Sequence, residues 1–222
     1  MFPLSWHLYF ELAAFLASLM FWKSIAKSKL IWFVPYLLLI VCVELTARYL
    51  YYELRQPNAW LYNLSVPIEY CFFASLFLFY TKSRLFRKML RSFIAIFFVY
   101  SVYSIIFITS LKFFNRDLLV VGGFFMIIFS VTYIVELYRQ DHEYNIWSLP
   151  MFWICLGTLL FNLGGFSRDL LGWFSSKDAF ANTIRILRGI NHGLNYVLYS
   201  CIIIAFICQK IFGTYRRESA DM

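Results

Sequence analysis

Residues 188–196 read RGINHGLNY, and the chain continues as VLYSCIIIAFICQK through residue 210. The second part is an apolar run of the kind that crosses a bilayer, which takes about 20 apolar residues in a helix. The first part places Arg188, Asn191, His192 and Asn195 at the spacing i, i+3, i+4 and i+7. These positions lie on one face of an α-helix, within an arc of about 100°. The stretch therefore predicts a membrane-spanning helix with a polar stripe at one end.

The composition of the whole chain agrees with this interpretation. Of 222 residues, 62% are hydrophobic and only 14% are charged, whereas a soluble domain carries about 25% charged residues. The start, MFPLSWHLYFE, has no basic segment and places Glu11 in the first apolar run, so we expect a retained span and not a cleaved signal peptide. The five cysteines lie in apolar runs without a CxxC pair, which indicates neither a disulfide framework nor a zinc site.

Seven apolar segments are long enough to predict seven transmembrane helices. The loops on one side hold 12 Lys and Arg residues, and those on the other side hold six. By the positive-inside rule the amino terminus is outside and the carboxyl terminus is cytoplasmic. The expected fold is all-α, with one transmembrane domain over residues 1–209 and a short basic tail over 210–222, in a bacterial inner membrane. The predicted spans lie near residues 5–22, 30–51, 60–80, 92–110, 118–138, 149–166 and 186–209.

A short frame occurs twice, as IWFVP at 31–35 and IWSLP at 146–150. It aligns the second and sixth spans and suggests a three-helix unit used twice, with the fourth helix as the linker. Chance is an equally good explanation, because Trp and Pro are common at membrane interfaces. The 3+1+3 layout is similar to that of the SWEET sugar transporters and PQ-loop proteins, although the chain has no proline-glutamine pair. The segments PIEY and WICLG also resemble uncharacterised small bacterial seven-helix membrane proteins, a resemblance that implies no known activity.

The polar residues inside the predicted spans gather at one depth, in the outer half. A charged side chain at mid-membrane costs about 3 kcal/mol, so such groups turn inward and pair. We therefore predict a polar cavity open to the outside. Its expected lining is Glu11, Glu44, Arg48, Asn63, Glu69, Asn162, Arg188, Asn191, His192 and Asn195.

Each of these residues also has a structural interpretation. Arg48 and Arg188 could reach the headgroups, and Glu44 could neutralise Arg48 one turn along the same helix. The four asparagines could join helices, at about 1 kcal/mol each. Glu69 is the strongest candidate for a functional role, because it lies beside Pro67 and its own helix offers no basic partner.

Several chemistries are excluded or weakened by the residues present. No lysine lies inside a predicted span, which excludes a retinal Schiff base, and the three histidines cannot form a three-histidine zinc site. His192 with two of the glutamates could hold a metal ion, but carboxylate-rich membrane cavities more often bind protons or cationic ligands. GFSRD lacks the pattern of a serine nucleophile, so nothing supports an enzyme.

The sequence thus favours a sensor or accessory subunit that binds a small polar ligand or protons, with Glu69 and His192 as the titratable centre. We expect no metal and no cofactor, and the bilayer as a partner, together with a membrane or cytoplasmic protein that receives the signal. The net charge of +8 follows from the loop bias and requires no nucleic acid. A small-solute or proton-coupled transporter is the first alternative, and a structural assembly protein is the second.

Overall fold

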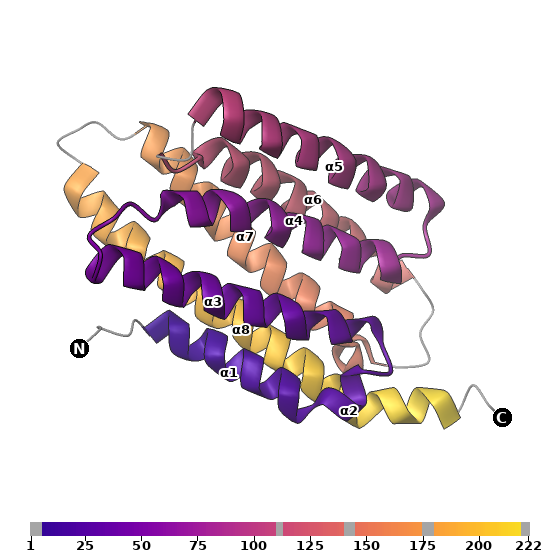
Figure 1. Ribbon diagram of the computed structural model, residues 1–222. Coiled ribbons are helices and arrows are strands. Elements are labelled where there is room, and N and C mark those ends of the chain that lie inside the picture. Colours follow the sequence, from indigo (N-terminus) through magenta and orange to yellow (C-terminus); the bar gives the residue numbers. More distant parts are fainter. Residues whose placement is uncertain (1–5, 110–112, 140–144, 175–179, 219–222) are drawn as a thin grey trace.

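The computed structural model describes residues 6–109, 113–139, 145–174 and 180–218, without the side chains of 108–109, 168–188, 191–192 and 214–218. Every regular element in this part of the chain is helical (Figure 1). The elements are α1 (Trp6–Met20), α2 (Trp22–Ile25), η1 (Lys29–Trp32), α3 (Phe33–Tyr52), α4 (Ala59–Tyr80), α5 (Arg84–Tyr103), η2 (Ser104–Thr109), α6 (Arg116–Arg139), η3 (Ile146–Ser148), α7 (Pro150–Phe174) and α8 (Phe180–Glu218).

The predicted all-helical fold is confirmed for the described residues, and the apolar helices are compatible with a membrane protein. Six of the long helices are long and apolar enough to cross a membrane: α3 with η1, α4, α5, α6, and parts of α7 and α8. The remaining one, α1, is apolar but has 15 residues. At 1.5 Å per residue it covers about 22 Å, less than the roughly 30 Å of a hydrocarbon core.

Six helices form a closed ring in which each contacts the next. The order around the ring is α1, α3, α4, α6, α7 and α8, and α8 returns to α1. The helix α5 lies outside the ring and packs mainly on α4 (Figure 1). This places the predicted linker helix apart from the two sets of three. In each repeated frame the Ile-Trp pair lies in a 3-10 helix that precedes a long α-helix. The duplication itself stays a prediction.

Three helices extend beyond the predicted apolar spans. The first residues of α5 are strongly basic, and the helix begins at Arg84 because the hydroxyl of Ser83 accepts a hydrogen bond from the backbone N–H of Phe86. Helix α7 continues to Phe174, beyond the predicted end of the sixth span at residue 166. Helix α8 runs from residue 180 to 218 and includes most of the predicted tail. Helical hydrogen bonding thus continues where hydrophobicity stops.

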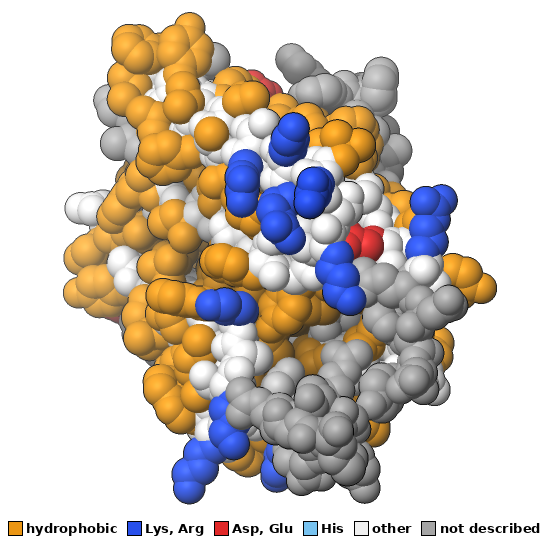
Figure 2. Space-filling view, turned by 90° about the vertical axis from the view of Figure 1, so that its right-hand side faces the viewer, with side chains coloured by type: hydrophobic (Ala, Val, Ile, Leu, Met, Phe, Trp, Pro, Cys, Tyr) orange, Lys and Arg blue, Asp and Glu red, His pale blue; other side chains and the backbone are white. Residues whose placement is uncertain are grey.

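The two ends of the bundle differ in charge. Successive helices alternate in direction, so the ends of α1, α4, α6 and α8 and the starts of α3, α5 and α7 meet at one end (Figure 1). Figure 2 shows this end, where Lys and Arg side chains gather with very few acidic ones. The described basic residues there are Lys23, Lys27, Lys29, Lys82, Arg84, Arg87, Lys88, Arg91, Arg139 and Lys210. We call this the basic end.

Glycines allow two of the closest helix contacts in the ring. A Cβ atom at Gly122 of α6 would lie 2.3 Å from the Tyr70 ring of α4. On α7, a Cβ atom at Gly157 would lie 2.8 Å from Cβ of Cys201, which belongs to α8. Without these side chains the helix backbones approach each other closely, as is common in membrane bundles.

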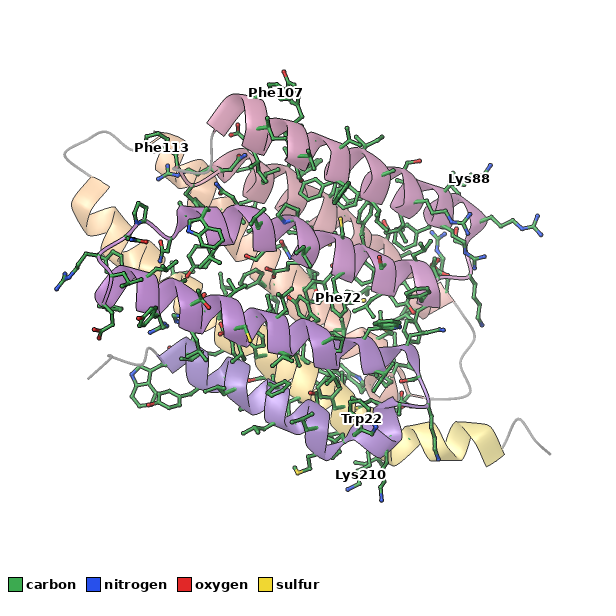
Figure 3. All side chains as sticks on the ribbon, viewed as in Figure 1. Trp22, Phe72, Lys88, Phe107, Phe113 and Lys210 are labelled. Carbon is green, nitrogen blue, oxygen red and sulfur yellow. The ribbon has the colours of Figure 1, made fainter. Side chains whose placement is uncertain are left out.

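Toward the basic end, the centre of the ring is aromatic. Phe33 of α3 packs edge-to-face on Phe72, with ring centroids 5.1 Å apart, and on Phe206 of α8 at 5.6 Å. Tyr36 stacks on Phe72 with centroids 4.0 Å apart, and Phe72 lies in the middle of the bundle in Figure 3. The rings fill the space between α3, α4 and α8 and fix their spacing.

Candidate functional site

The polar cluster of the bundle begins where α1 and α3 pack together. The nitrogen Nε2 of His7 lies 2.9 Å from Nη2 of Arg48. A guanidinium carries only donors, so the His7 nitrogen is the acceptor in this contact, and the same nitrogen lies 3.6 Å from Oε2 of Glu44. Arg48 also lies one turn from Glu44, with Nε and Oε2 separated by 3.7 Å. The predicted pairing of Glu44 with Arg48 is therefore present, and it extends to His7.

Helix α4 joins this cluster through two side chains. The hydroxyl of Tyr62 donates a hydrogen bond to Oε1 of Glu44 over 3.2 Å. The carboxyl of Glu69 hydrogen-bonds to the hydroxyl of Tyr36 from α3 and lies close enough to interact electrostatically with Glu11 and Glu44. Glu69 thus has a tyrosine as its partner, where the sequence offered none.

Glu11 is the buried acid of the cluster. Its side chain is 3% exposed, and it lies on the inner face of α1 with Ala14 and Ser18. Its Oε2 atom has no hydrogen-bond partner among the described residues. Ligand atoms of His7, Glu11 and Glu44 all lie within 4.8 Å of one another. Glu11 therefore presents a buried carboxyl oxygen without a described hydrogen-bond partner beside a second carboxyl group.

The cluster contains more acid than base. Glu11, Glu44 and Glu69 supply three carboxyl groups, and Arg48 is the permanent cation among the described side chains around them. Tyr199 of α8 faces the same carboxyl groups. Because an ionised carboxylate without a partner is costly away from water, three ionised carboxylates are more than this environment can balance.

The donor set of His7, Glu11 and Glu44 is also of a kind that binds divalent metal ions. In this arrangement the His7 nitrogen is already hydrogen-bonded to Arg48, and the guanidinium also lies beside Glu44. A metal ion would have to displace Arg48, whereas a proton on a carboxyl group would not. The geometry accordingly fits a proton better than a metal ion.

Asn63 of the predicted lining lies at a different place and holds the connection between α5 and α6. Its Nδ2 donates to the carbonyl oxygen of Phe113 at 2.7 Å, and its Oδ1 accepts from the backbone N–H of Asn115 at 2.9 Å. Asn115 in turn donates to the hydroxyl of Ser104 at 2.7 Å. Both ends of the Asn63 amide are therefore used within the protein, which agrees with the structural interpretation of this residue.

The other predicted lining residues are Asn162, Asn195 and three residues whose side chains lie outside the described part. Nδ2 of Asn162 donates to the carbonyl of Thr158 in its own helix at 2.8 Å, and its Oδ1 points toward Gly123 of α6. Asn195 is half-buried on α8. The side chains of Arg188, Asn191 and His192 lie outside the described part, so the stripe that opened the sequence analysis stays a prediction.

Three tyrosines that complete the cluster, at positions 36, 62 and 199, were not predicted from the sequence. His7 lies one turn before Glu11 on the same helix face, which makes it a plausible partner of Glu11 from spacing alone, although it was not among the predicted lining residues. A buried tyrosine hydroxyl needs a hydrogen-bond partner, but sixteen tyrosines in one chain gave no way to select these three.

Comparison with known proteins leaves the function to be argued from this geometry. No protein-family model, no curated protein and no solved structure matches the chain.

Proposed function

We propose that this protein is embedded in a membrane, binds protons at the carboxyl groups of Glu11 and Glu69, and acts as a sensor or accessory subunit. One observation carries the proposal: the buried Glu11 carboxyl has an oxygen without a hydrogen-bond partner, beside more carboxyl groups than cations. Binding a proton neutralises one carboxylate without any rearrangement. A small polar ligand has less support, because Glu44, Arg48 and Asn63 are already engaged with one another or with the backbone.

A sensor has more support than a carrier. A carrier needs a polar route to the opposite surface, as alternating-access transporters have at the interface of their two halves. Between the cluster and the basic end, the described centre of the ring is filled by the aromatic side chains of Phe33, Phe72, Phe73 and Phe206. Proton flux into sealed vesicles that contain the purified protein would favour the transporter instead.

The pH dependence of thermal stability tests the proposal. The groups that face Glu11 come from its own helix and three others: His7 from α1, Tyr36, Glu44 and Arg48 from α3, Tyr62 and Glu69 from α4, and Tyr199 from α8. If the folded cluster holds a proton that the unfolded chain has released, the folded state binds more protons, and stability falls as pH rises. For one such proton, the free energy of unfolding should fall by about 1.4 kcal/mol per pH unit.

The substitution Glu11→Gln removes the titrating group and keeps its shape. We expect a flatter dependence of melting temperature on pH and equal or higher stability at alkaline pH. Glu53→Gln is the matched control, since Glu53 is exposed in the loop after α3, and it should keep the wild-type profile. A wild-type profile in Glu11→Gln would contradict proton binding at this carboxyl.

A further inference from the structure

A second site lies at the basic end and is independent of the carboxyl cluster. A pocket of about 590 Å³ opens between the end of α1, the short helix α2 and the last turns of α8. Among the described side chains, its lining includes Lys23, Lys27 and Lys210 and no acidic residue. Trp22 and Lys210 lie at this end of the bundle in Figure 3. Three amines around one pocket attract an anion.

The position of this pocket along the helices places it at the membrane surface. The apolar run of α1 ends at Met20 and is followed by Trp22 and Lys23, and Trp and Lys are typical of the headgroup level. On the membrane side of these residues, Leu19 and Met20 also line the pocket and are 44% and 73% exposed. The lining is therefore basic at the surface and apolar toward the hydrocarbon.

One of the three lysines is held in place by an aromatic ring. The ammonium nitrogen of Lys210 lies 5.4 Å from the ring centroid of Phe21, a cation–π geometry that joins α8 to the end of α1. The neighbouring Gln209 adds an amide donor to the same lining. The pocket thus offers several hydrogen-bond donors to the oxygens of one anionic group.

We propose that this pocket binds the phosphate headgroup of an anionic phospholipid, with an acyl chain along Leu19 and Met20. Lys23 and Lys210 neutralise the phosphodiester, and the exposed apolar side chains cover the start of the chain. A soluble phosphate would leave the apolar part of the lining empty. Basic pockets between helices at a membrane surface are suited to such headgroups, and each basic residue near an anionic surface contributes about 1 kcal/mol, a factor of roughly five in binding.

Lipid retention measured by mass spectrometry tests this proposal. The purified protein is offered equal amounts of phosphatidylglycerol and phosphatidylcholine in detergent, and we expect the phosphatidylglycerol to be retained preferentially. The variant Lys23→Gln/Lys210→Gln should show this preference lowered by about 25-fold, a factor of roughly five for each lysine. The control Lys82→Gln/Lys88→Gln removes the same charge from the same end, outside the pocket lining, and should keep it.

Two results would overturn the site. An equal loss of preference in both double variants would indicate diffuse attraction to the basic end. Displacement of the lipid by inorganic phosphate or glycerol phosphate at comparable concentration would indicate an anion site without a lipid requirement.

A fluorescence measurement on the protein with all of its native lysines tests the same proposal and does not depend on the folding of the lysine variants. Brominated phosphatidylglycerol should quench Trp22 more strongly than brominated phosphatidylcholine, with Trp22→Phe identifying the Trp22 signal. Equal quenching by the two lipids would contradict the proposal.

Discussion

The imidazole nitrogen Nε2 of His7 accepts a hydrogen bond from Arg48, whose guanidinium also faces Glu44 on the same helix. One cation thereby joins α1 to α3 and balances one of three nearby carboxyl groups. The side chains of Arg48 and Glu44 are 14% and 17% exposed, so water screens the pair only partly. The arrangement of charge in the cluster depends on this one arginine.

We predict that Arg48→Gln destabilises the fold and that the double variant Glu44→Gln/Arg48→Gln recovers most of the loss. Removing one partner of a largely buried pair leaves an uncompensated charge, at a cost of about 2–4 kcal/mol, whereas replacing both removes the charge altogether. A double-mutant cycle on the free energy of unfolding measures the coupling. If the loss in the double variant equalled the sum of the losses in the two single variants, the two side chains would not interact.

We predict opposite effects for two adjacent glycines of α6. Gly122→Ala places a methyl group 2.3 Å from the Tyr70 ring, whose hydroxyl also donates to the carbonyl of Leu119 at 3.2 Å. The Tyr70 ring is held by its attachment to α4 at one end and by its hydroxyl at the other. We therefore expect Gly122→Ala to lower the free energy of unfolding by about 1–3 kcal/mol. Gly123→Ala meets atoms only at 3.5 Å or beyond and should be neutral or stabilising, since alanine favours a helix by about 1 kcal/mol. Equal melting temperatures for the two variants would contradict this packing.

We predict that Asn63→Leu costs about 2–4 kcal/mol, because it leaves the Phe113 carbonyl and the Asn115 N–H without partners. Asn162→Leu is the matched control, since this buried amide donates to a carbonyl of its own helix. The Asn162→Leu variant should lose less than about 1 kcal/mol of its free energy of unfolding. Similar losses for both variants would argue against Asn63 as the residue that holds the α5–α6 connection.

We predict graded effects at Tyr36, which joins the carboxyl cluster to the aromatic core. Tyr36→Phe removes the partner of Glu69 and keeps the ring stacked on Phe72, so it should cost about 1 kcal/mol. Tyr36→Leu also removes the stack and should cost about 2 kcal/mol more. Tyr49→Phe, at an exposed position of the same helix, should leave stability unchanged. A larger loss in Tyr36→Phe than in Tyr36→Leu would contradict this division of roles.

The sequence predicted parts of the candidate site for a clear physical reason. The spacing of Glu44 and Arg48 fixes their separation on any α-helix, and the burial of Glu11 follows from its face of α1. Contacts between helices could not be predicted in this way. The partners His7–Arg48, Tyr62–Glu44 and Tyr36–Glu69 each join two helices, and spacing along one helix says nothing about its rotation relative to another.

The sequence by itself determined that this chain forms apolar helices suited to a membrane and that their loops carry more basic charge on one side. Both properties follow from local composition, because hydrocarbon requires each helix to satisfy its own backbone. Only the tertiary structure decided which helices close the ring, that α5 lies outside it, and that Asn63 holds a loop while Glu11, Glu44 and Glu69 face one another. These outcomes depend on side-chain packing between helices, where a glycine at 122 or a tyrosine at 36 sets the approach and rotation of a whole helix.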